Sequence, residues 1–178
     1  MTRLLERERT ALVVIDVQEG FRPAVGEFDA VARNAGLLVQ GARILGLPVL
    51  VTEQYPRGLG ETVPEVAEHL DGAPRLEKVE FDATDVEGFD LAERDQALLC
   101  GIEAHVCVAQ TAAGLLDRGV DVQVATDAVS SRTAANRRAG LAKMEATGAV
   151  LTSTEMALFE LLGRAGTPEF KEVQALVK

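Results

Sequence analysis

The residue best suited to covalent chemistry is Cys107. It follows an apolar run, residues 98–100, and a short turn that starts at Gly101, and it opens a long helical pattern. A thiol in the first turn of a helix faces unpaired backbone N–H groups and the positive end of the helix dipole, and both favour the thiolate. Position alone leaves two interpretations open, a nucleophile or a small buried apolar residue. Cys100, inside the apolar run, is expected to fill the core.

Two charged side chains are candidate partners for this thiol. Asp16 directly follows five apolar residues, and Lys78 has apolar neighbours at Val79 and Phe81. A carboxylate beside a thiol can accept its proton and pass it to a leaving group. A partly buried ammonium would keep that carboxylate ionised. The alternatives stay open, because a carboxylate at a strand end often caps a loop and most lysines reach solvent.

Apolar runs and helical patterns alternate along the chain. Strands are predicted at residues 11–15, 48–52, 76–81, 96–101, 120–125 and 149–151, and a loop at 53–60. Helices are predicted at 28–45, 64–70, near Leu91, and at 105–118, 134–147, 155–162 and 168–177. Continuous apolar runs are typical of strands buried on both faces of a parallel sheet. The sequence predicts one α/β domain over residues 1–178, a three-layer doubly wound sheet, mainly parallel, with about six strands.

The predicted strand ends bring the polar candidates together. In open parallel sheets, ligands bind just beyond the carboxyl ends of the strands. Asp16 and Glu53 end two of the predicted strands, Lys78 lies in or near a third, and Cys107 follows a fourth. We therefore expect these side chains to share one crevice.

Charge and cysteine content disfavour certain partners and a disulfide-rich secreted domain. The formal net charge of −10 disfavours nucleic acid and anionic membranes, which attract basic surfaces. Two cysteines do not form the dense disulfide framework of a small secreted domain. Residues 1–10 lack an apolar signal core, and no apolar run reaches membrane-spanning length. A cytoplasmic protein without nucleic-acid or membrane partners is the prediction.

Three segments resemble a known family. Residues 14–21 (VIDVQEGF), Lys78, and residues 101–108 (GIEAHVCV) are similar, in this order, to the isochorismatase-like cysteine hydrolases, which include nicotinamidases and N-carbamoylsarcosine amidase. The resemblance spans almost the whole chain. Residues 52–60, 152–155 and 168–172 further resemble the isochorismatase-domain-containing proteins and their small bacterial relatives, whose substrates are poorly defined.

The resemblance implies a catalytic triad of Asp16, Lys78 and Cys107. In it, Cys107 attacks a carbonyl carbon, Asp16 carries the proton, and Lys78 supports the charges. The resemblance also implies a cis peptide bond between Ile102 and Glu103, with the backbone amides of Glu103 and Cys107 forming an oxyanion hole. The implied activity is hydrolysis of a small amide or related C–N bond through an acyl-enzyme. A homo-oligomer, dimer or higher, is also implied.

The resemblance departs from its metal-dependent members. Those nicotinamidases bind metal through an Asp-x-His pair and a further His near the second strand, where this chain has Glu53, Gln54 and Tyr55. Its two histidines, His69 and His105, lie in separate segments, so we expect no metal and no other cofactor. The expected substrate-binding residues are of three kinds. Phe21, Tyr55 and Phe81 would form apolar walls, Gln18 and Gln54 would orient a substrate amide, and His105 would line the pocket.

Two other functions stay open on the sequence. A non-enzymatic binding or redox-responsive protein would keep the fold and the reactive Cys107 without turnover. A hydrolase of an isochorismate-like vinyl ether would use the same crevice without needing a thiol nucleophile.

Overall fold

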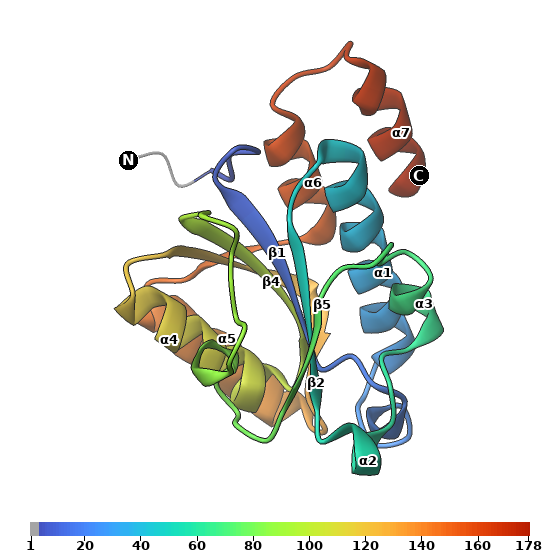
Figure 1. The fold of residues 1–178 in the computed structure, drawn as a ribbon. Helices are drawn as coiled ribbons and strands as arrows, with labels where there is room; N and C mark the ends of the chain where they lie inside the picture. Colours follow the sequence, from blue (N-terminus) through green and yellow to red (C-terminus); the bar gives the residue numbers. More distant parts are fainter. Residues whose placement is uncertain (1–3) are drawn as a thin grey trace.

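The computed structural model describes residues 4–178 and contains one six-stranded sheet (Figure 1). Neighbouring strands all pair in parallel, in the order β3-β2-β1-β4-β5-β6. The predicted doubly wound α/β sheet is confirmed, and it is entirely rather than mainly parallel. The strands are β1 (Thr10–Ile15), β2 (Val49–Gln54), β3 (Arg75–Lys78), β4 (Gln96–Ile102), β5 (Asp121–Ser130) and β6 (Val150–Thr152).

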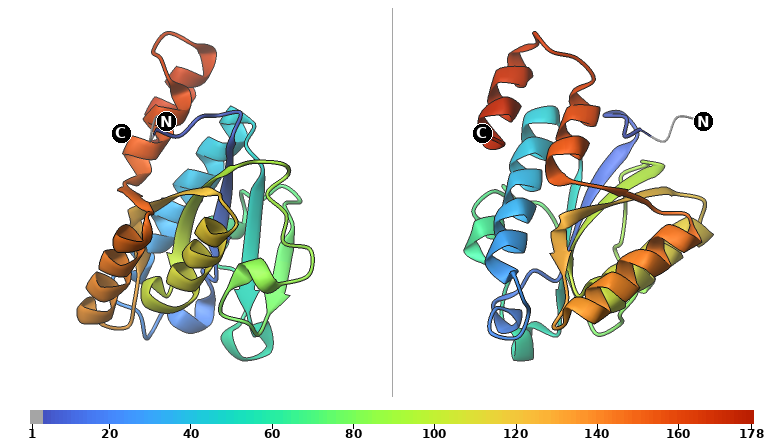
Figure 2. Two further views of the ribbon diagram at one scale, coloured as in Figure 1. Left: turned by 90° about the vertical axis from the view of Figure 1, so that its left-hand side faces the viewer. Right: turned by 180° about the vertical axis from the view of Figure 1, so that it is seen from behind.

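Helices cover both faces of the sheet (Figures 1 and 2). One face carries α1, α3 and α6, with α7 packed against α1 and α6, while α4 and α5 cover the other. The helices are α1 (Phe28–Leu45), α2 (Pro56–Leu59), α3 (Pro64–Ala67), α4 (Ala109–Asp117), α5 (Ala134–Thr147), α6 (Thr154–Leu162) and α7 (Pro168–Leu176). Short 3₁₀ helices span Glu19–Phe21 and Ala83–Asp85. Within residues 4–178, no helix is both long and apolar enough to cross a bilayer.

The continuous apolar run of β1 reflects burial on both faces. Every residue of this strand is buried, and its side chains alternate between two cores. Leu12 and Val14 face the core under α1, whereas Val13 and Ile15 face the core under α4 and α5. A central strand of this kind has no polar face, which explains why its sequence lacks alternation.

The direction of the chain across the sheet reverses between β1 and β4. From β1 the chain proceeds outward through β2 to β3, and then returns to the opposite side of β1 to form β4. The loops after these two central strands therefore diverge, as at the switch points where open α/β sheets bind ligands. These carboxyl ends lie at the lower edge of the sheet in Figure 1.

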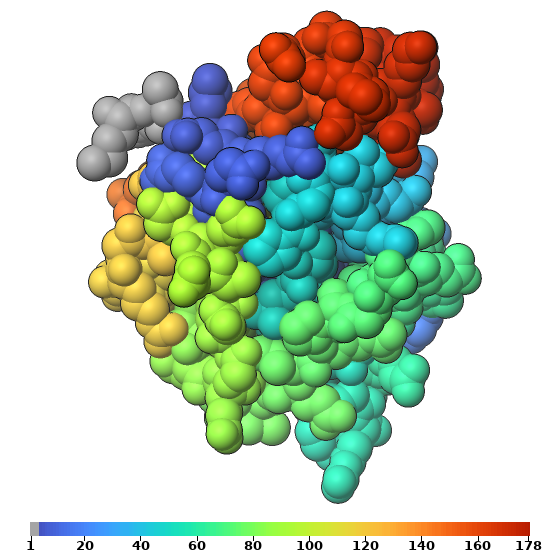
Figure 3. Space-filling view, turned by 45° about the horizontal axis from the view of Figure 1, so that its top comes forward, coloured from blue at the N-terminus to red at the C-terminus, as the bar shows by residue number. Residues whose placement is uncertain are grey.

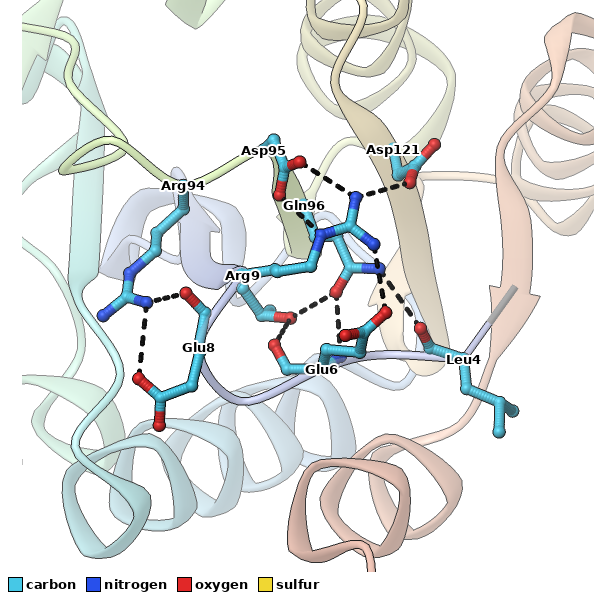
Figure 4. A network of polar contacts seen from close by, with 9 residues as sticks. Leu4, Glu6, Glu8, Arg9, Arg94, Asp95, Gln96 and Asp121 are labelled. Atoms are coloured by element: carbon cyan, nitrogen blue, oxygen red, sulfur yellow. Dashed lines mark hydrogen bonds and ion pairs between the residues drawn. The ribbon is translucent and has the colours of Figure 1, made fainter. Parts of the chain in front are cut away.

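A polar network fastens the opposite, amino-terminal edge (Figure 4). The guanidinium of Arg9 donates to both carboxylate oxygens of Asp95, at 2.8 and 2.9 Å, and to Asp121 at 3.2 Å. The side chain of Gln96 bonds the backbone of Glu6 and Leu4. Figure 3 shows the N-terminal segment lying beside the C-terminal helices across this end of the molecule. These contacts join the starts of β1, β4 and β5.

Four local predictions are wrong in detail. The predicted strand 76–81 ends at Lys78, because its only neighbour, β2, ends at Gln54 opposite it. The predicted loop 53–60 instead extends β2 to Gln54 and then forms α2, a one-turn helix that begins at Pro56. No helix forms near Leu91; a 3₁₀ turn capped by the Asp82 side chain lies earlier in this connection. β5 runs further than predicted, to Ser130.

Close contact between the two central strands requires glycine at position 101. Gly101 has a φ of +128°, and a Cβ atom there would overlap the backbone of Ile15. We expect Gly101→Ala to lower the free energy of unfolding by more than about 3 kcal/mol in urea denaturation, because strain and overlap act together. The control is Gly166→Ala, with φ +83° and open space around it, which should cost only about 1–3 kcal/mol. Equal losses in the two variants would contradict this account.

Candidate active site

An ion pair with no solvent contact joins the carboxyl ends of β1 and β3. The Nζ atom of Lys78 is 2.7 Å from Oδ2 of Asp16, and both side chains are 0% exposed. The ammonium also donates to Oε1 of Gln54 at 2.5 Å and to the carbonyl of Glu80 at 3.1 Å. Its three N–H groups thus have three acceptors, which is what a buried ammonium requires.

The Asp16 carboxylate is held from two sides. Thr52 donates its hydroxyl to Oδ1 at 2.7 Å, opposite the Lys78 contact on Oδ2. The residue itself has a φ of +54°, a left-handed conformation that turns the chain out of β1. Sequence reasoning missed Thr52, although a polar residue at the end of β2, paired in register with Ile15, was a usable signal.

The Cys107 thiol lies next to the Asp16–Lys78 ion pair. It belongs to a π-helical turn, Ala104–Val108, that precedes α4, and it interacts with both the Asp16 carboxylate and the Lys78 ammonium. Its Sγ atom also lies 3.9 Å from Oε1 of Gln54. The structure therefore brings together the three residues of the predicted triad from three different strand ends.

The electrostatic state of the thiol differs from the prediction. Burial, and then the negative charge of Asp16, raise the pKa of Cys107 to about 12, although Lys78 opposes the shift. Burial and Asp16 thus oppose the thiolate that the position of Cys107 near a helix start favours. Desolvation outweighs the nearby positive charge because the side chain is almost wholly buried. At neutral pH the resting group is a neutral thiol.

The elbow after β4 has the predicted backbone. The peptide bond between Ile102 and Glu103 is cis. The Glu103 side chain is turned aside, since its Oε1 accepts from the backbone N–H of Arg132 at 2.9 Å and from the guanidinium at 3.1 Å. The backbone amides of Glu103 and Cys107 stay our predicted oxyanion donors.

The two glutamines predicted to orient a substrate are both hydrogen-bonded within the protein. Gln18 is fully buried, with its amide bonded to the backbone of Gln54 and Gly60. The Gln54 amide donates to the carbonyl of Val79 and accepts from Lys78. Gln18 therefore fixes a loop, and its predicted contact with a substrate stays a prediction.

The predicted aromatic walls are in different environments. Phe21 packs against the core under α1. Tyr55 and Phe81 are 55% and 52% exposed, so they form no enclosed wall within this chain. Tyr55 and Lys78 do line a shallow cavity of about 380 Å³ beside the ion pair. His105 is half-buried, with Nδ1 3.0 Å from the hydroxyl of Ser131.

Within residues 4–178, no three His, Cys, Asp or Glu side chains are grouped as a metal site would need. Glu53, in β2, is hydrogen-bonded to Thr62. The backbone N–H and the hydroxyl of Thr62 donate to its carboxylate at 2.7 and 2.6 Å. Metal-independent chemistry stays a prediction.

A doubly wound sheet with an acid, an ammonium and a thiol at its switch point defines an α/β protein of the isochorismatase-like class. The Isochorismatase domain matches residues 10–156. The chain is 42% identical over 177 residues to a secreted isochorismatase effector of Phytophthora sojae, covering 95% of this chain and 84% of that one. It is 40% identical over 177 residues to isochorismatase domain-containing protein 2 of Danio rerio, covering 97% and 89%.

Two solved structures are also similar. One is described as MAR1 ribonuclease from Caenorhabditis elegans, with 40% identity, a TM-score of 0.92 and coverage of 98% of this chain and 92% of that one. Another is YcaC from Pseudomonas aeruginosa with hexane-2,5-diol and covalent acrylamide, with 27% identity, a TM-score of 0.88 and coverage of 99% and 92%. The chain belongs to the isochorismatase-like hydrolase family, as its motifs indicated.

The buried ion pair predicts strong energetic coupling. We expect Lys78→Met and Asp16→Asn each to lower the free energy of unfolding in urea by about 3–5 kcal/mol, because each leaves a desolvated partner unpaired. The double variant should lose less than the sum of the two, by about 1–3 kcal/mol. Strict additivity would mean that the two charges do not stabilise one another.

The raised pKa of Cys107 predicts an alkaline alkylation profile. In a Cys100→Ala background, the rate of reaction with iodoacetamide should rise about tenfold per pH unit and should still be rising between pH 9 and 10, because the thiolate fraction grows until the pH reaches the pKa. Glutathione, an exposed thiol, serves as the control and should level off near its own pKa. A plateau for Cys107 below pH 9 would mean that the free protein already holds a thiolate.

Proposed function

We propose that this protein is a metal-independent cysteine hydrolase that cleaves a small amide or a related C–N bond through an acyl-enzyme. The observation that carries the proposal is one buried cluster in which Asp16 interacts with both the Cys107 thiol and the Lys78 ammonium. A nucleophile, a base within reach of its proton and a charge that holds the base ionised are the parts that acyl transfer by a thiol needs.

In the first half of the proposed reaction, Sγ of Cys107 attacks the carbonyl carbon while its proton passes to Asp16. The carbonyl oxygen takes up the negative charge and accepts hydrogen bonds from the backbone amides of Glu103 and Cys107. The C–N bond then breaks, and Asp16 returns the proton to the departing nitrogen. The products of this half are a thioester and, from a primary amide, ammonia.

In the second half, water replaces the amine. Asp16 accepts a proton from the water as its oxygen adds to the thioester carbon, and the C–S bond breaks. The departing sulfur regains the proton from Asp16, and the acid product leaves. One water is consumed and one amide bond is cleaved, and the three side chains return to their starting protonation.

The raised pKa of Cys107 means that Asp16 must accept the thiol proton during the reaction. Because the resting sulfur is a thiol, proton transfer must accompany the formation of the C–S bond. Lys78 contributes in both directions, since its ammonium is paired with Asp16 and its charge favours the sulfur anion whenever the thioester collapses. The same pKa disfavours a redox-responsive role, since oxidation of cysteine proceeds through the thiolate.

Similar proteins support and test the proposal. The YcaC structure contains covalent acrylamide, and acrylamide is an electrophile of the kind that thiols attack. The similar C. elegans structure is described as a ribonuclease, so RNA cleavage is a competing activity. A formal net charge of −10 disfavours a polyanionic substrate, and we therefore favour a small neutral molecule.

Assembly and location complete the proposal. A homo-oligomer stays our prediction. Of the apolar residues in the C-terminal helices, Leu158, Leu161 and Val173 are packed into the core, while Met156 and Phe159 on α6 are exposed and could contact another copy. With two free cysteines in the described chain, a reducing, cytoplasmic environment stays the predicted location.

An ammonia-release screen over small primary amides tests the proposal. At least one amide should be hydrolysed, and Cys107→Ala should lose activity by a factor of at least about 10⁴, because without the sulfur no acyl-enzyme forms. Cys100→Ala is the matched control and should keep full activity. Parallel assays use single-stranded RNA and a vinyl ether such as isochorismate.

Three results of the screen would contradict the proposal. Amide turnover that survives Cys107→Ala would exclude covalent catalysis. Cleavage of RNA or of the vinyl ether, with all amides inert, would assign one of the competing activities. Reversible oxidation of Cys107 with no turnover in any assay would favour the redox-responsive alternative.

A further inference from the structure

The backbone of Gln54, at the end of β2, is held by a buried side chain as well as by its neighbouring strands. The buried side chain of Gln18 accepts from its N–H at 2.7 Å and donates to its carbonyl at 3.0 Å. The same Gln18 amide also donates to the carbonyl of Gly60 at 2.7 Å. This clamp determines where the Gln54 side chain starts and the direction in which it leaves β2.

The Gln54 amide has one orientation and all of its contacts lie within the protein. Its Nε2 donates to the carbonyl of Val79 at 2.9 Å, so its oxygen must point the other way. That oxygen, Oε1, is 2.5 Å from Nζ of Lys78 and 3.9 Å from Sγ of Cys107. It is a neutral acceptor that touches both the cation and the nucleophile.

We propose that Gln54 is a positioning residue that sets the geometry and the charge balance of the Lys78–Cys107 pair. Its oxygen supplies the acceptor that holds the ammonium between the Asp16 carboxylate and the sulfur. Because that acceptor is uncharged, the cation remains available to Asp16 and to a developing sulfur anion. The inference deepens the function proposed above and rests on it.

A carboxylate at position 54 would change this balance. A glutamate there would pair with Lys78 in competition with Asp16 and would place a second negative charge beside the sulfur. Both changes disfavour the thiolate, because like charge and loss of the counter-ion each raise a thiol pKa. A methionine there would keep the length of the side chain and would leave the ammonium one acceptor short.

The alternative is that Gln54 binds substrate directly, as the sequence suggested. A residue that binds substrate and transition state equally raises KM on removal and leaves kcat unchanged, whereas loss of a positioning residue lowers kcat. The rate of Cys107 alkylation adds a readout that needs no substrate. The two roles therefore predict different results.

The experiment compares Gln54→Glu, Gln54→Met and the control Gln40→Glu, all in a Cys100→Ala background. Gln40 lies on α1 and bonds the carbonyl of Gly36, so its variant adds the same charge away from the crevice. At pH 8, Gln54→Glu should react with iodoacetamide at least tenfold more slowly than the parent, and Gln40→Glu within twofold of it. Thermal melts identify any variant that fails to fold, and Gln54→Met provides the second test in that case.

Turnover is then measured on an amide found in the screen. Gln54→Met should lower kcat at least tenfold with KM within threefold of the parent. Alkylation of Gln54→Glu at the parental rate, or a higher KM with unchanged kcat in Gln54→Met, would overturn the inference. If no amide is hydrolysed, the proposed function fails, and the alkylation rates still decide whether Gln54 governs the thiol.

Discussion

The buried ion pair between Asp16 and Lys78 is the interaction on which the site depends. Two charges without solvent contact are costly to desolvate, and they persist only when each has enough polar partners. Here Thr52 covers one carboxylate oxygen, while Gln54 and the Glu80 carbonyl complete the ammonium. Thr52 and Gln54 belong to β2, the strand between the two charges, and Glu80 follows β3.

The ion pair also explains how a nearly buried thiol can be unreactive at rest and still attack a bound carbonyl. Burial and the carboxylate keep Cys107 protonated, whereas the ammonium favours its anion. A substrate carbonyl that receives the sulfur electrons removes the cost of forming a desolvated thiolate, provided that the proton leaves at the same time. The geometry is thus suited to a coupled step, and it protects the sulfur from reaction when no substrate is bound.

The sheet supplies the convergence that this chemistry needs. Asp16 leaves β1 in a left-handed conformation, and Gly101 lets β4 approach the carbonyl of Ile15 closely. The chain changes direction between β1 and β4, and the π-helical turn after β4 carries the sulfur. Residues from both halves of the chain therefore meet at one end of the sheet.

The sequence by itself determined the class of fold, the central strands and three of the residues that meet at the crevice, because buried parallel strands leave continuous apolar runs and the motif residues follow their ends. Only the tertiary structure decided the roles of the partners. Nothing in the local sequence shows that Thr52 and Gln54 bind the charges of the ion pair. Nor does it show that Tyr55 and Phe81 are exposed. The protonation of Cys107 was decided in the same way, since desolvation depends on everything packed around the sulfur and not on its place in a helix.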